Sequence, residues 1–373
     1  MHLAFVDFVY HYDAARPDTD EPLGGTTSAV CFLARALVTA GISCTFFNRV
    51  AEKREAHGII SLPLQALADE ITRDTYDAYI FCGRWTPELV GLVRAHTQKP
   101  LIAWAHESVF APPMTQALED FDGVVFVSEW QKRVNQASVK PNWKQAVIRN
   151  AMNPAVAASF PAGAPILAAK ETPPLLIFTG SFARGAFHIP PLLDKIRPHC
   201  KDFSVEMFCN LDASRHAASD TAYADWLRSQ PNITHIGMVG QRELAQRMRR
   251  ATLLLAPNPW PETSCIALIE GLASGLTAIT TNRAALPETA SGFAQHIPIE
   301  SPDDLTRFDM PIDYDAFAEA VLKALHEYKT APTEPETRLR RQIDYFHANY
   351  QWEQRVAAWR EFILSLRSAP QPS

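Results

Sequence analysis

Residues 253–271 read LLLAPNPWPETSCIALIEG, which places a run of leucines before a proline-rich turn and an apolar helix pattern. The leucines predict a buried strand, and the prolines exclude a helix before Glu262. Thr263 or Ser264 stands where a helix cap is needed, and Gly275 is placed to end the helix. The first backbone N–H groups of a helix have no partner within it and attract anions such as a diphosphate. The segment therefore predicts a strand, a turn and a helix whose start binds an anion.

Strands and helices alternate from this segment toward both ends of the chain. Short apolar runs predict strands at Leu3–Val9, Cys44–Arg49, Ala78–Cys82, Leu101–Ala105, Gly123–Val127, Ala146–Ile148, Leu175–Thr179, Ser204–Phe208, Ile233–Ile236, Thr252–Ala256 and Thr277–Thr280. Helical periodicity predicts helices at Ser28–Ala40, Pro87–Thr97, Arg242–Arg250 and Cys265–Ala273. Continuous apolar strands that alternate with helices are typical of α/β proteins in which helices cover both faces of parallel sheets.

A linker rich in Ala and Pro, residues 153–174, separates the strands into two series. We therefore predict two Rossmann-like, doubly wound domains at residues 1–155 and 156–330, which face a central cleft. Ligands of such sheets bind at the carboxyl ends of the strands. Residues 331–373 show a long helix pattern from Pro332 onward, and it includes Trp352 and Trp359. Two tryptophans on one helix need a large apolar surface, so we expect this tail to pack back across the domains.

Composition narrows the classes of protein that the chain can belong to. Of its 373 residues, 47% are hydrophobic and 20% are charged, and the formal net charge is −6, which argues against nucleic acid as a partner. The six cysteines form no C-x-x-C pair, which indicates buried thiols in a reducing compartment. The N-terminal residues do not form a signal peptide, and no apolar run reaches the ~20 residues that span a bilayer. We expect a cytoplasmic protein with at most peripheral contact at the inner face of a membrane.

The segment PWPETSCIALIE, residues 259–270, closely resembles the E-x7-E segment of retaining glycosyltransferases of family 4. Other segments resemble that family as well: GGTTS (24–28), WAHES (104–108), FVSEW (126–130), IRNAM (148–152), FTGSFARG (178–185), HIGMVG (235–240), LPET (286–289) and the final Trp352-Glu353. The resemblance extends over nearly the whole chain. It implies the GT-B architecture, in which two Rossmann-like domains face a cleft and the last helix crosses back.

The same resemblance implies an activity and a set of site residues. The protein is expected to move a sugar, with retention, from a UDP- or GDP-sugar to a carbohydrate, lipid-linked or other cell-envelope acceptor, and to need no metal or cofactor. The catalytic residues would be His106, Glu262 and Arg184. The donor would be bound by Gly25, Gly180, Arg184, Val239, Gly240, Glu262, Thr263, Ser264, Cys265, Ile266 and Glu270. Glu262 would meet a sugar hydroxyl, Glu270 a ribose and Arg184 the diphosphate.

Two segments depart from the family pattern. Ser181 stands where many members have an arginine, which leaves Arg184 as the basic residue of the donor loop. Residues 282–285, NRAA, lack the glycines that are usual there. These departures leave the sugar, the base and the source of a second phosphate-binding cation open.

Other chemistries remain as alternatives. A sugar-nucleotide epimerase or a catalytically silent nucleotide-sugar-binding module could use the same architecture. Asp120-Phe121-Asp122 forms a D-x-D, which is expected to be a solvated turn rather than a metal site. His106 lacks a second histidine at zinc spacing and could instead be a core histidine. There is no G-x-S-x-G or G-x-G-x-x-G motif, and the oligomeric state is open.

Overall fold

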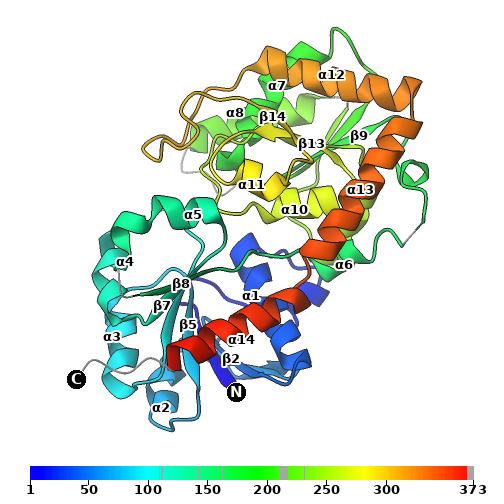
Figure 1. The fold of residues 1–373 in the computed structure, drawn as a ribbon. Coiled ribbons are helices and arrows are strands. Elements are labelled where there is room, and N and C mark those ends of the chain that lie inside the picture. The colour runs from blue at the N-terminus through cyan, green and yellow to red at the C-terminus, as the bar shows by residue number, and fades with distance from the viewer. Residues whose placement is uncertain are drawn as a thin grey trace. The chain divides into compact units, whose positions relative to one another are not determined.

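The computed structural model describes residues 1–108, 110, 112–140, 143–161, 163–210, 217–230 and 232–367. The chain folds into two compact units, each with its own sheet (Figure 1). Unit 1 contains Met1–Thr19, Leu23–Ala151 and the chain from Gln351 onward, and unit 2 contains Asp20–Pro22 and Met152–Tyr350. Both units are doubly wound α/β structures, so the predicted fold class is confirmed.

The sheet of unit 1 has the strand order β3-β4-β2-β1-β5-β6-β7-β8. Its strands are β1 (His2–Val6), β2 (Ser43–Asn48), β3 (Arg54–Ala56), β4 (Ile59–Pro63), β5 (Ala78–Gly83), β6 (Leu101–Ala105), β7 (Gly123–Phe126) and β8 (Lys144–Val147). All neighbours pair in parallel except the edge strand β3, which runs antiparallel to β4. The expected parallel sheet is thus extended by an antiparallel edge hairpin that the sequence did not predict.

Helices cover this sheet, and one of them comes from the C-terminal part of the chain. They are α1 (Gly25–Thr39), α2 (Leu67–Ile71), α3 (Pro87–His96), α4 (Pro112–Gln116), α5 (Glu129–Val134) and α14 (Glu353–Arg367). The Trp359 ring of α14 packs edge-on against the Trp104 ring of β6, with 5.1 Å between the ring centroids. A Cβ at Gly123 would lie 2.8 Å from the Phe362 ring, so the glycine lets α14 approach the sheet closely. The predicted return of the last helix is confirmed.

The prediction of one continuous tail helix from Pro332 is wrong, because the segment forms two helices. The helix α13 (Thr333–Asn349) ends before Tyr350, and α14 begins at Glu353. The Tyr350 carbonyl accepts a hydrogen bond from the Met152 backbone N–H at 3.0 Å instead of continuing the helical ladder. The break therefore lies where the chain passes between the two units.

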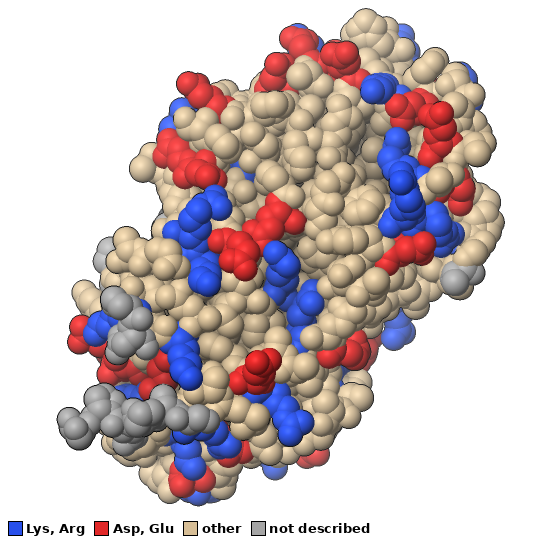
Figure 2. Space-filling view, viewed as in Figure 1, with Lys and Arg blue, Asp and Glu red and all other residues tan. Residues whose placement is uncertain are grey.

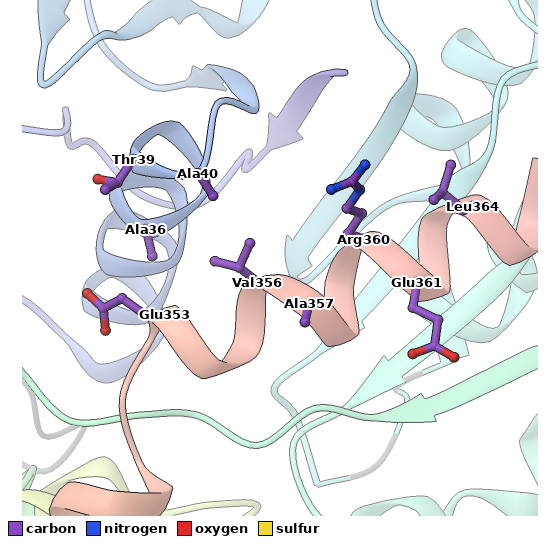
Figure 3. A pocket seen from close by; sticks show the side chains of 9 residues that line it. All are labelled: Ala36, Thr39, Ala40, Glu353, Val356, Ala357, Arg360, Glu361 and Leu364. Atoms are coloured by element: carbon purple, nitrogen blue, oxygen red, sulfur yellow. The ribbon is translucent and has the colours of Figure 1, made fainter.

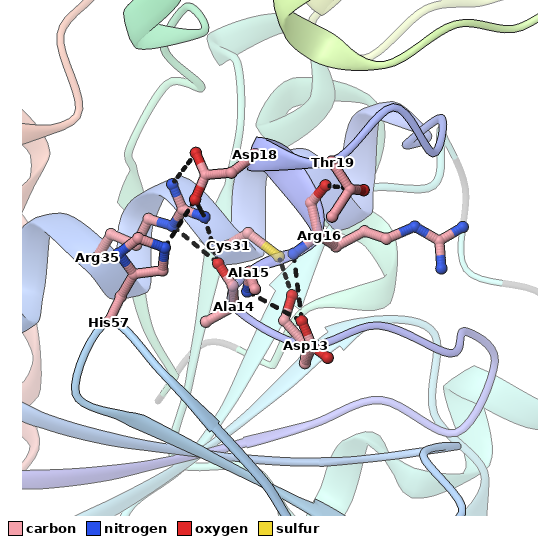
Figure 4. Close-up of polar contacts among 9 residues, drawn as sticks. All are labelled: Asp13, Ala14, Ala15, Arg16, Asp18, Thr19, Cys31, Arg35 and His57. Atoms are coloured by element: carbon pink, nitrogen blue, oxygen red, sulfur yellow. Dashed lines mark hydrogen bonds and ion pairs between the residues drawn. The ribbon is translucent and has the colours of Figure 1, made fainter.

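Two further features of unit 1 involve α1. Between α1 and α14 lies a groove of about 650 Å³, which is lined by Ala36 of α1, by Ala40 just after it and by Val356 of α14 (Figure 3). On another side, Arg35 is ion-paired with Asp18 at 2.7 Å and donates a hydrogen bond from Nε to the Ala14 carbonyl at 2.9 Å (Figure 4). These contacts tie the segment that follows β1 to α1.

The sheet of unit 2 is parallel throughout, with the order β11-β10-β9-β12-β13-β14. Its strands are β9 (Leu175–Thr179), β10 (Ser204–Phe208), β11 (Ile233–His235), β12 (Leu253–Ala256), β13 (Thr277–Thr281) and β14 (Gln295–Ile297). Its other helices are α6 (Pro154–Ala157), α7 (Ile189–Ile196), α8 (Ala217–Ser229), α9 (Gln241–Arg250), α10 (Ile266–Ala273), α11 (Leu286–Ala290) and α12 (Tyr314–Thr330). Alternate residues of each strand point to opposite faces, so Leu176 packs against the α7 and α12 side and Ile177 against the α9 and α10 side.

Strand order creates a switch point between β9 and β12. From β9 the chain moves to β10 and β11 on one side, and it then returns to β12 on the other side. Ligands of open α/β sheets bind at such a switch point, beside the loops that follow the two strands at the carboxyl edge of the sheet. Both loops belong to segments whose sequence resembles glycosyltransferase motifs. On the face of the molecule in Figure 2, basic and acidic side chains lie interspersed.

Candidate functional site

The loops after β9 and β12 lock together through one glycine. Gly185 has a φ of 116°, and a Cβ there would lie 2.3 Å from the Pro257 carbonyl oxygen. Backbone strain and this close approach both require glycine at the position. The contact holds the residue before it, Arg184, against the segment that contains Glu262.

Arg184 and Glu262 form an ion pair at this position. The Glu262 side chain is only 7% exposed, whereas the Arg184 side chain remains 39% exposed. The Arg184 guanidinium also lies over the Trp260 ring, 5.6 Å from its centroid. Residues that lie 78 positions apart in the sequence thus form one polar cluster at the switch point. The cluster therefore combines a partly exposed cation with a buried carboxylate.

Asn258 organises this cluster, although it was not among the predicted site residues. Its side-chain oxygen accepts a hydrogen bond from the Trp260 N–H at 2.9 Å, and its amide donates to the Glu262 carboxylate at 3.1 Å. The Asn258 carbonyl in turn accepts the hydroxyl of Thr281 at 2.7 Å. The sequence signal was an asparagine between two prolines, a context that favours an Asx turn.

The start of α10 differs from the prediction. Neither Thr263 nor Ser264 caps the helix; the capping position is Cys265, in the left-handed region with a φ of 47°, and its side chain makes no capping hydrogen bond. Thr263 and Ser264 are buried instead, and the Ser264 carbonyl accepts the Thr289 hydroxyl at 2.8 Å. A non-glycine residue in this conformation costs about 1 kcal/mol or more, and such strain is concentrated at functional sites. Burial raises the pKa of the Cys265 thiol, which therefore stays protonated.

Glu270 lies inside unit 2 and is 4% exposed. Its carboxylate accepts a hydrogen bond from the Asn153 backbone N–H at 3.1 Å, and burial raises its pKa to about 7. The Asn153 amide donates to the carbonyl of Gln241, which follows Gly240 at the start of α9, at 2.9 Å. These hydrogen bonds connect Glu270 to the segment that contains Val239 and Gly240.

His106 and Gly25 belong to unit 1, while the other predicted site residues belong to unit 2. His106 follows β6 and its ring lies 4.8 Å from the Trp104 ring. Burial lowers the pKa of His106 to about 3, so the imidazole is neutral. Gly25 begins α1, next to Thr26, whose methyl group would lie 3.2 Å from a Cβ at Gly83, the last residue of β5. Both predicted residues therefore lie near the carboxyl edge of the unit 1 sheet.

The D-x-D segment has a structural role. Asp122 accepts hydrogen bonds from the Leu101 N–H at 2.8 Å and from Arg94 at 2.6 Å, which closes the turn before β7 as predicted. Nowhere in the described residues do three or more His, Cys, Asp or Glu side chains gather as a metal site would require. No helix in the described part of the chain is long and apolar enough to cross a membrane.

The fold is that of solved glycosyltransferases. Sucrose-phosphate synthase from Thermosynechococcus elongatus superposes with a TM-score of 0.72 and 15% identity, over 99% of this chain and 100% of that one. A glycosyltransferase from Rickettsia africae gives a TM-score of 0.73 and 13% identity, over 99% of both chains.

The chain has the GT-B fold. Another GT-B structure, HepE from Anabaena in complex with UDP and glucose, gives a TM-score of 0.68 and 11% identity, over 98% of this chain and 100% of that one. The resemblance inferred from the motifs is confirmed at the level of the fold. No protein-family model matches the sequence, and no curated protein sequence matches it.

Proposed function

We propose that this protein is a retaining glycosyltransferase of family 4, which transfers a hexosyl group from a UDP- or GDP-sugar. The proposed acceptor is a carbohydrate, a lipid-linked glycan or another component of the cell envelope. The observation that carries the proposal is the Arg184–Glu262 pair at the switch point of the unit 2 sheet. A guanidinium donates to phosphate oxygens and a carboxylate accepts from hydroxyls, so the pair suits a ligand in which a diphosphate adjoins a sugar.

The proposed chemistry is governed by charge on the leaving group. Breaking the anomeric C–O bond leaves positive character on the sugar and negative charge on the diphosphate. The partly exposed guanidinium of Arg184 and the first N–H groups of α10, after Cys265, would stabilise that negative charge. In a front-face reaction with retention, the leaving phosphate oxygen takes the proton of the acceptor hydroxyl. These groups require no metal ion.

The remaining residues would hold the rest of the donor. Glu262, kept in place by Asn258, would accept a hydroxyl of the transferred sugar. Glu270 would accept the ribose hydroxyls, and Val239 and Gly240 would lie beside the base. His106, as a neutral imidazole, would bind a sugar hydroxyl from unit 1.

The test compares the wild-type protein with Arg184→Ala and a matched control. Arg197→Ala is the control, because Arg197 is also an arginine of unit 2 and pairs with Asp194 and Asn232, outside the Arg184–Glu262 cluster. Labelled UDP- and GDP-sugars are incubated with each protein, and the anomeric configuration of the product is followed by NMR. We expect transfer or slow hydrolysis with retention, a loss of about 10²-fold in kcat/KM for Arg184→Ala, and near-normal activity for the control.

Two outcomes would contradict this proposal. Conversion of the nucleotide sugar into its epimer, without release of the sugar, would identify an epimerase. Tight nucleotide binding without turnover of any donor would identify a binding module.

A further inference from the structure

The second segment that departs from the family pattern contains a fully buried arginine, Arg283. Its side chain is 0% exposed and its guanidinium donates to backbone carbonyls of one loop, residues 301–307. Nη1 donates to Ser301 at 3.2 Å and to Pro302 at 2.8 Å, and Nη2 donates to Arg307 at 2.7 Å and also to Asp304. The fork of N–H donors thus holds four carbonyls of the loop.

Only an arginine can make this arrangement. A guanidinium presents its donors in a rigid plane, whereas a lysine ammonium has three donors at a point. Burying a charge among carbonyls is costly unless its hydrogen bonds are made. The loop conformation and the side chain at position 283 therefore depend on each other.

The loop leads directly to the Arg184–Glu262 cluster. Phe308 follows the loop, is 42% exposed, and its ring lies 4.6 Å from the ring of Trp260. The Trp260 ring is the one that lies 5.6 Å from the Arg184 guanidinium. A series of contacts thus joins the buried arginine, through Phe308 and Trp260, to Arg184, the residue proposed to bind the phosphates.

A second connection runs through the backbone beside Arg283. Ala284 has a φ of 53°, a conformation unusual for alanine, and its N–H donates to the Pro302 carbonyl at 3.1 Å. The next N–H, of Ala285, donates to the Glu262 carbonyl at 3.1 Å. The same short segment therefore contacts both the loop and Glu262.

We propose that Arg283 is a positioning residue for the Arg184–Glu262 pair. It fixes residues 301–308, whose Phe308 keeps the Trp260 ring beside the Arg184 guanidinium, so that the guanidinium is held ready for a diphosphate. The ligand chemistry rests on the proposed function, whereas the effect on Trp260 does not.

The first readout is the fluorescence of Trp260. The difference between the wild-type spectrum and that of Trp260→Leu isolates its emission. We expect Arg283→Lys and Phe308→Ala to shift this emission to longer wavelength, because each lets water reach the ring. Arg94→Lys is the matched control, since Arg94 also donates to loop carbonyls, at Asp120 and Thr97, but in unit 1. An unchanged emission in Arg283→Lys and Phe308→Ala would overturn the proposal.

The second readout is the Kd of UDP or GDP, measured by calorimetry. A partly desolvated cation–π contact is worth about 1 kcal/mol, so Arg283→Lys and Phe308→Ala should each weaken binding about fivefold. In a Trp260→Leu background neither change should weaken binding further, because both act through that ring. Losses that simply add in the double variants would overturn the proposal, as would unchanged affinity in both single variants.

These readouts separate the two proposals. If the wild-type protein binds neither UDP nor GDP, the proposed function fails, and the emission of Trp260 still decides the role of Arg283. If the wild type binds and transfers while Arg283→Lys and Phe308→Ala bind equally well, only the role of Arg283 is wrong. Phe308 is exposed, so its variant tests the loop even where Arg283→Lys lowers the stability.

Discussion

Replacing Glu270 by glutamine removes a buried acid with little change of shape. The glutamine oxygen can still accept the Asn153 N–H, which lies 3.1 Å from the Glu270 carboxylate. The change therefore isolates the cost of ionising a carboxyl group inside unit 2, where this side chain is 4% exposed.

The sign and the size follow from the pKa. Burial raises the pKa of Glu270 from 4.5 to about 7. Between those pH values the folded protein keeps a proton that the unfolded chain releases, so the free energy of unfolding falls as the pH rises through this window. At about 1.36 kcal/mol for each pH unit, the loss amounts to about 3 kcal/mol. Above about pH 7 this contribution no longer changes.

Urea unfolding of the wild type and of Glu270→Gln at pH 5 and pH 8 measures this contribution. We expect the wild type to lose about 2.5 kcal/mol more than the variant over that range, because pH 5 already lies inside the window. Glu206→Gln is the control, because it makes the same substitution at another carboxylate of unit 2, which is ion-paired with Arg247 at 2.7 Å. Parallel pH profiles for the wild type and Glu270→Gln would refute the reasoning.

Four further predictions concern binding, turnover and packing. Glu270→Ala should raise the Kd of the best nucleotide about 10- to 100-fold, from the loss of a charge-assisted hydrogen bond, and unchanged calorimetric affinity would contradict the ribose role. His106→Ala should leave that Kd unchanged and lower kcat; a lower Tm together with a higher Kd and a lower kcat would identify a core histidine instead. Turnover should persist in EDTA, and a complete, reversible loss of turnover would instead support a metal site at the D-x-D segment. Gly185→Ala should lower the Tm and abolish turnover, because its Cβ would lie 2.3 Å from the Pro257 carbonyl, while Gly91→Ala, with open space around it, should do neither.

The sequence predicted those strands that are buried on both faces. The predicted ranges of β6, β9 and β10 match the structure. The strands β6 and β9 are continuous apolar runs, as expected of strands covered on both faces, whereas Glu206 interrupts β10. The strands β3, β4 and β14 were missed; β3 and β14 are edge strands whose sequences, REA and QHI, are short and polar. Their pairing depends on neighbouring strands rather than on their own composition.

Within the candidate site, the sequence indicated which residue types lie on which element. The strand, the proline turn and the helix of residues 253–271 follow from local chemistry, and so does the expectation of an anion site. Local chemistry misplaced the start of the helix, because Ser264 and Thr263 are drawn into the interior of unit 2 and Cys265 takes the capping position. Tertiary contacts outweighed a capping preference worth about 1 kcal/mol.

The sequence by itself determined two doubly wound domains and the segment that forms the candidate site. Only the tertiary structure decided that Arg184 meets Glu262, that Asn258 holds that carboxylate, and that Arg283 fastens a loop beside them. The physical reason is the strand order: β9 and β12 become neighbours although β10 and β11 intervene in the chain. Contacts between the loops that follow β9 and β12 depend on that pairing, and no local pattern of residues predicts the pairing.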